Sequence, residues 1–96
     1  MDRIQAMQMF MRVAEAGSFV RAAETLSLPA STVTNTIKNL EKYLKVRLLN
    51  RTTRRVSLTP EGMQYLAQCR EILALIEHSE STLSESVARP QGRLRV

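Results

Sequence analysis

Residues 18–62 of the chain read SFVRAAETLSLPASTVTNTIKNLEKYLKVRLLNRTTRRVSLTPEG. A short segment with apolar residues at helical spacing is followed by a break at 27–29 and then by a longer periodic segment, which predicts two helices joined by a tight turn. We expect Ser18 to cap the first helix and Pro29 to open the second, because proline needs no amide hydrogen there. The second helix covers about residues 30–45, and its apolar stripe advances in steps of four, three and four: Val33, Ile37, Leu40 and Leu44.

The opposite face of this second helix is polar and carries no carboxylate, unlike a helix that only meets water, which usually mixes Glu with Lys. Its side chains are short hydrogen-bonding groups with lysines towards the end: Ser31, Thr32, Thr34, Asn35, Lys38, Asn39 and Lys42. After Val46 the pattern changes to two short strands over 48–51 and 55–58, with an arginine-bearing turn at 52–54. Two helices followed by a basic β-hairpin are typical of a winged helix-turn-helix. The predicted fold class is therefore mainly α, with three helices and a two-stranded wing.

The segments on either side complete this fold. Before the quoted stretch, Asp2 can cap a first helix that ends at Gly17, since the residue just past a helix often needs a left-handed backbone. At its end, Thr59 and Pro60 give a strong start to a last helix without a breaker before residue 89. That helix is too long to bury its apolar stripe on so small a body, so we expect it to pair with a second copy. The expected seam is Leu66, Cys69, Leu73, Ile76 and Leu83.

The predicted organisation has three parts. Residues 1–58 form the winged domain, 59–89 form a linker helix for dimerisation, and 90–96 form a hinge that leads into the first strand of a further domain.

Charge is distributed unevenly along the chain, which has a formal net charge of +5. Between 38 and 55 the only acid is Glu41, whereas this stretch contains Lys38, Lys42, Lys45, Arg47, Arg51, Arg54 and Arg55. From 61 to 85 glutamates outnumber the one arginine, Arg70. The centre of the chain therefore favours a polyanionic partner and the last helix does not.

Several function classes find no support in the sequence. With one cysteine and one histidine, and without a glycine-rich phosphate loop, no nucleophile–base pair or metal site can be assembled, so we predict neither an enzyme nor a cofactor. The single Cys69 cannot form an internal disulfide, which favours the cytoplasm. There is no signal peptide, and no apolar run approaches the ~20 residues of a membrane span.

The quoted stretch resembles the N-terminal domain of LysR-type transcriptional regulators. The shared pattern is Gly-Ser-Phe, a paired Ala-Ala with Leu three residues on, a recognition helix ending in Leu-Glu, then Leu-Leu-x-Arg and Leu-Thr-x-x-Gly. It is carried here by Gly17, Ser18, Phe19, Ala22, Ala23, Leu26, Val33, Ile37, Leu40, Glu41, Leu48, Leu49, Arg51, Leu58, Thr59 and Gly62. Two positions depart from the family: its usual Ser-Arg pair is Thr34-Asn35 here, and Pro29-Ala30 replaces its polar helix start. These departures leave the fold intact and leave the operator sequence open.

We expect two chains to pair through antiparallel linker helices, with a tetramer as the alternative in the full-length protein, and to bind an interrupted inverted repeat in double-stranded DNA. The resemblance implies a C-terminal domain, beyond this chain, that senses a small molecule. The residues expected to read bases are Ala30, Ser31, Thr32, Thr34 and Asn35. Those expected on the backbone or in the minor groove are Ser18, Lys38, Lys42, Arg51, Thr53, Arg54 and Arg55.

Three other classes of function remain as alternatives to DNA binding. A winged helix can instead bind protein, which would require an apolar or mixed-charge face on the third helix. It can also bind RNA, which relies on stacked aromatic side chains that are scarce in this chain. A coiled-coil scaffold explains residues 60–89 and nothing before them.

Overall fold

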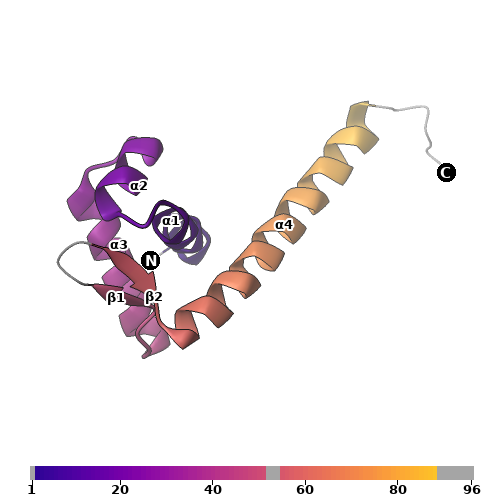
Figure 1. Ribbon diagram of the computed structural model, residues 1–96. Helices are drawn as coiled ribbons and strands as arrows, with labels where there is room; N and C mark the ends of the chain where they lie inside the picture. The colour runs from indigo at the N-terminus through magenta and orange to yellow at the C-terminus, as the bar shows by residue number, and fades with distance from the viewer. Residues whose placement is uncertain (1, 52–54, 89–96) are drawn as a thin grey trace.

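A computed structural model describes residues 2–51 and 55–88, with the side chains of 86–88 excepted. Its elements follow the order α1 (Arg3–Ala16), α2 (Phe19–Leu26), α3 (Ala30–Leu44), β1 (Leu49–Arg51), β2 (Val56–Leu58) and α4 (Pro60–Ala88). Figure 1 shows α1, α2, α3 and the hairpin gathered into one body, from which α4 extends as a long rod. The predicted fold class, a mainly helical winged helix-turn-helix with a long last helix, is confirmed.

The helix ends lie where short polar residues and left-handed residues predict them. The side chains of Asp2 and Ser18 accept hydrogen bonds from the amides of Gln5 and Arg21, both at 3.2 Å. Gly17 ends α1 with a φ of 69°. Ser27 and Lys45 end α2 and α3 with φ values of 57° and 60°, a conformation that costs a non-glycine residue on the order of 1 kcal/mol.

Pro29 lies directly before α3, whose start agrees with the predicted one at about residue 30. It is the N-cap residue, with φ −62° and ψ 143°, and the helix begins one residue later at Ala30. Its extended ψ turns its carbonyl towards the amides of Thr32 and Val33, at 3.1 and 3.3 Å. Because proline has no polar side-chain atom, α3 starts without a side-chain cap.

The core joins all four helices and the hairpin. Phe10 is fully buried in α1, and its ring lies 5.7 Å from that of Tyr65 in α4. Leu66 and Cys69 are also buried, at 8% and 0% exposure, in the same core. The prediction of these two residues as part of the dimer seam is therefore wrong: the first turns of α4 pack on their own chain. The core reaches beyond residue 58, the predicted end of the winged domain.

The start of α4 is fixed to the strands by Thr59. Its hydroxyl oxygen accepts from the amide of Gly62 at 2.9 Å, and its hydroxyl donates to the carbonyl of Arg47 at 2.6 Å. Its own amide donates to the carbonyl of Leu48 at 3.0 Å. A Cβ on Gly62 would overlap that same Leu48 carbonyl, so only glycine lets the helix approach the hairpin this closely.

Beyond Cys69, α4 leaves the body. Leu73 and Ile76 are half-buried, while Leu75 and Leu83 are 68% and 67% exposed. The helix spans 29 residues, or roughly 43 Å at 1.5 Å per residue, and the molecule measures 57 × 26 × 21 Å. About half of α4 therefore has little of its own chain to pack on.

Candidate nucleic-acid interface

A polar stripe runs along the exposed side of α3. Ser31, Asn35, Lys38 and Lys42 are separated by four, three and four residues, so they project from one face of the helix, and all four are exposed. Thr32 flanks the stripe on one side and is exposed. Its carbonyl accepts from the hydroxyl of Thr36 at 2.8 Å.

The other predicted base readers lie at the edges of this stripe. Ala30 and Thr34 are half-buried, and Ala30 packs against the core. The structure thus places Ser31, Thr32 and Asn35 outward together, whereas Ala30 offers only part of its methyl group and Thr34 is turned partly inward.

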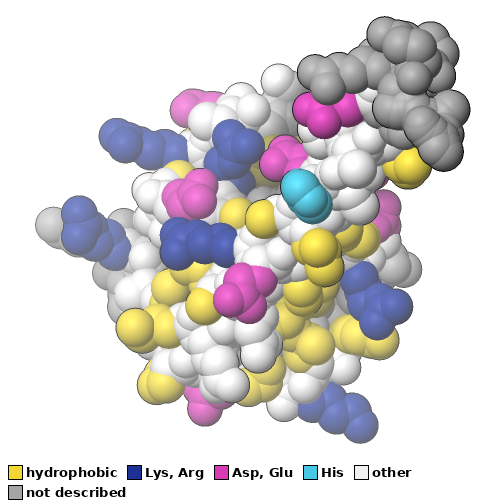
Figure 2. All heavy atoms as spheres, turned by 90° about the vertical axis from the view of Figure 1, so that its right-hand side faces the viewer, with side chains coloured by type: hydrophobic (Ala, Val, Ile, Leu, Met, Phe, Trp, Pro, Cys, Tyr) yellow, Lys and Arg dark blue, Asp and Glu magenta, His cyan; other side chains and the backbone are white. Residues whose placement is uncertain are grey.

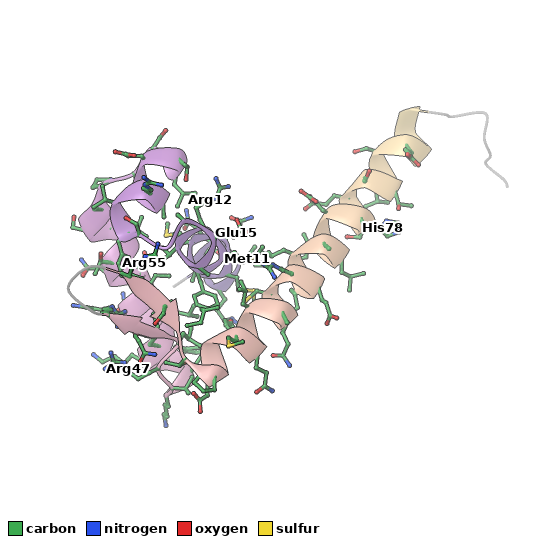
Figure 3. The ribbon with its side chains drawn as sticks, viewed as in Figure 1. Met11, Arg12, Glu15, Arg47, Arg55 and His78 are labelled. Carbon is green, nitrogen blue, oxygen red and sulfur yellow. The ribbon has the colours of Figure 1, made fainter. Side chains whose placement is uncertain are left out.

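The β-hairpin pairs Leu49 with Leu58 and Arg51 with Val56 in antiparallel register, and its inner side covers the core. Arg55 is exposed at the start of the returning strand. Figure 3 shows Arg47 and Arg55 on the hairpin side of the body, away from α4. The predicted contacts Thr53 and Arg54 lie outside the described residues.

Ser18 stands at the N-terminus of α2, where it is half-buried. Its oxygen accepts the amide of Arg21 at 3.2 Å, a bond that leaves the hydroxyl proton available to another acceptor. A helix N-terminus attracts anions, so this position remains compatible with the predicted phosphate contact.

Arg51 has internal contacts that its sequence position did not indicate. Its guanidinium is 2.8 Å from the Oε1 atom of Glu41 and its Cζ atom lies 5.6 Å from the ring centroid of Phe19. Its side chain is 24% exposed. Arg51 therefore binds within the domain, and its predicted phosphate contact stays a prediction.

Glu41 is the residue that sequence reasoning missed. It is buried at 8% exposure, and its Oε2 atom accepts hydrogen bonds from the amides of Leu48 and Leu49 at 2.9 and 3.2 Å. Burial alone would raise the pKa of Glu41, but the bonds from Arg51 and the two amides outweigh burial and hold the pKa below its ordinary value. The available signal was its position as the sole acid in a basic stretch.

The thiol of the buried Cys69 lies beside the hydroxyl of the half-buried Tyr65. Burial raises the pKa of Cys69, although the Tyr65 hydroxyl acts in the opposite direction, and burial with the neighbouring thiol raises the pKa of Tyr65 to about 12. Both groups are neutral near pH 7, which fits a structural role.

Residues 2–51 and 55–88 contain neither a metal site nor a membrane-spanning helix. No group of three or more His, Cys, Asp or Glu side chains there could hold a metal ion. Over the same residues, no helix combines the length and the apolar character that crossing a membrane requires.

A family profile and several curated proteins match this chain. The profile described as "Bacterial regulatory helix-turn-helix protein, lysR family" matches residues 4–63. An HTH-type transcriptional repressor of Pseudomonas aeruginosa is 50% identical over 96 residues, which is 100% of this chain and 30% of that protein. The HTH-type transcriptional regulator CrgA of Neisseria meningitidis serogroup C is 45% identical over 92 residues, 96% of this chain and 31% of that protein. The chain spans about a third of the length of these relatives.

Solved structures match it as well. The DNA-binding domain of BenM in complex with catB site 1 DNA superposes with a TM-score of 0.85 at 28% identity, covering 88% of this chain and 93% of that one. The DNA-binding domain of CbnR in complex with DNA gives a TM-score of 0.83 at 35% identity, covering 90% and 98%.

Proposed function

The chain belongs to the LysR family of bacterial helix-turn-helix regulatory proteins, and on this premise we propose that it is the DNA-binding part of a transcriptional regulator. In this proposal α3 enters the major groove of double-stranded DNA, which is wide enough for one helix. The hairpin lies on the neighbouring backbone or minor groove. The two similar domains solved in complex with DNA support this reading.

The observation that carries the proposal is the stripe on α3. Ser31 and Asn35 offer donors and acceptors to base edges near the start of the helix, and Lys38 and Lys42 supply positive charge further along the same face. Asparagine can bond adenine through two atoms at once, and lysines bind phosphate. A protein-binding winged helix would require an apolar face at this place.

We further propose a homodimer. A groove of about 500 Å³ lies between α1 and the free part of α4, and it is lined by both apolar and charged side chains: Ile4, Gln8, Met11, Arg12, Glu15, Leu73, Ile76, Glu77 and Glu80. Seen from this side, hydrophobic side chains form a patch that charged side chains border (Figure 2). Apolar side chains flanked by charged ones on an unpartnered helix fit the α4 helix of a second copy, packed antiparallel.

Such a dimer presents two α3 helices to one face of the duplex. Its target is then an interrupted inverted repeat with half-sites about one helical turn apart. The relatives are about three times as long as this chain. We assign the sensing of a small molecule, and any tetramer, to the part of such a protein that this chain does not contain.

The direct test is fluorescence anisotropy of the 96-residue chain at several salt concentrations. One duplex carries an inverted repeat enriched from a random pool by binding to the wild type, and the other carries the same bases in scrambled order. We expect tight binding that weakens steeply with salt and prefers the repeat. Binding without preference would leave a generic DNA-binding domain, and no binding at low salt would favour the protein-binding alternative.

Asn35→Ala should weaken the binding free energy by about 1–3 kcal/mol on the enriched duplex and leave it almost unchanged on the scrambled one, because only a base contact distinguishes the two duplexes. Gln68→Ala removes a side-chain amide from an exposed position on α4, outside the proposed DNA surface, and should bind like the wild type. Equal losses on both duplexes would take Asn35 off the list of base readers.

Lys38→Ala should weaken binding to every duplex alike and lower the slope of log K against log salt by about one, as expected for one lost phosphate contact. Arg70→Ala makes the same change of charge on α4 and serves as the control. If the two variants shift the slope equally, Lys38 acts only through net charge.

A further inference from the structure

Three sets of polar contacts join the hairpin to α3 and to the end of α1. The carboxylate of Glu41, near the end of α3, accepts the amides of Leu48 and Leu49 at the start of β1. The same carboxylate holds Arg51 at the end of β1, at 2.8 Å. On the returning strand, the amide of Val56 points at the carbonyl of Gly17, at 3.5 Å.

Arg51 extends this connection to the second helix. Its guanidinium lies over the ring of Phe19, the first residue of α2 and the neighbour of the α2 cap. One ion pair therefore contacts the start of α2, the end of α3 and both ends of β1. The proposed function brings α3 and the hairpin onto one DNA surface, and Ser18 beside the start of α2 is a predicted phosphate contact.

We propose that Glu41 is a positioning residue that sets the angle of the hairpin against α3, so that both can contact one duplex at the same time. This inference rests on the proposed function and adds to it a residue that touches no DNA. Glu41 is buried and its oxygens are occupied by three donors, so it acts on DNA only through Arg51 and the two β1 amides.

The direction in which Glu41→Gln changes DNA affinity distinguishes a positioning role from simple electrostatics. Glu41→Gln removes a negative charge next to a DNA surface, and Coulomb's law alone predicts tighter binding. A positioning role predicts weaker binding, because the neutral amide gives up the charge-assisted bond to Arg51 and the hairpin loses its fixed angle. Glu24→Gln makes the same change of charge on the exposed face of α2 and measures the electrostatic effect alone.

The experiment uses the 96-residue chain and a duplex enriched from a random pool with the wild type. Hydroxyl-radical cleavage follows the sugars at the flanks of the site, and guanine N7 methylation follows the major groove. We expect E41Q to lose the flanking hydroxyl-radical protection, keep the methylation protection, and bind about tenfold more weakly, the scale typical of a coupled polar network. E24Q should keep both protections and bind at least as tightly as the wild type.

In one outcome, the wild type protects the flanks while E41Q binds DNA as tightly as the wild type or more tightly. That result would overturn the role of Glu41 and leave the proposed function intact. Absence of any wild-type footprint would overturn the proposed function itself. Should far-UV circular dichroism show that E41Q is unfolded, Arg51→Lys decides the question. It keeps the net charge and both amide bonds to Glu41, and lysine serves well as a phosphate contact but does not supply the planar fork. Flanking protection that persists in R51K at wild-type affinity contradicts the proposal.

Discussion

Leu73→Asp is expected to split the proposed dimer and to lower affinity for the inverted repeat by about 100-fold or more. Leu73 is half-buried on the floor of the groove between α1 and α4, where a second copy would bury a carboxylate without a partner. A monomer keeps one half-site and loses the gain of linked binding, which typically amounts to about 10²–10⁴. Sedimentation velocity measures the split, and anisotropy on whole and half sites measures the loss.

Leu75→Asp is the matched control. Leu75 is 68% exposed and does not line the groove, since two residues along a helix turn the side chain to another side. This variant should stay dimeric. A dimer that survives Leu73→Asp and is split by Leu75→Asp would place the seam on the outer face of α4.

Phe10→Ala should lower the free energy of unfolding by about 3–5 kcal/mol. Phe10 is fully buried and packs against Tyr65, so its loss opens a cavity between α1 and the start of α4. The total free energy of unfolding of a domain is only about 5–15 kcal/mol. Binding of a second copy adds to its apparent stability. Urea unfolding at one fixed protein concentration measures the change.

Phe10→Leu keeps most of the apolar volume and should cost much less than the alanine variant. A small effect of Phe10→Ala, below about 1 kcal/mol, would mean that the surrounding helices close the cavity. In that case the α1–α4 contact does not depend on this ring.

Local signals were enough to predict most of the fold. Asp2, Gly17, Ser18 and Thr59 each act on the backbone within a few residues, and each lies where its chemistry predicts. The stripe on α3 was also predictable, because helical spacing alone decides which side chains share a face.

Contacts between distant residues were not predictable in this way. The charge of Arg51 indicated a phosphate contact, yet its partner Glu41 stands ten positions earlier and meets it only after the hairpin folds back. Leu66 and Cys69 continue the same heptad pattern as Leu73, and nothing in that pattern tells where the helix leaves the body. The pattern shows that a residue is covered, and only the fold shows by which chain.

The departure of α4 from the body bears on its thermodynamics. From Ser81 to Glu85 every side chain is exposed, so in a lone chain this end is held as a helix by bonds within the helix itself. Isolated helices shorter than about 12–15 residues are marginal in water. Helix formation at this end and association with a second copy are therefore linked equilibria. The negative circular dichroism signal per residue at 222 nm should become stronger as the protein concentration rises through the dimer dissociation constant. The length of ordered helix then reports what fraction of the protein is dimeric.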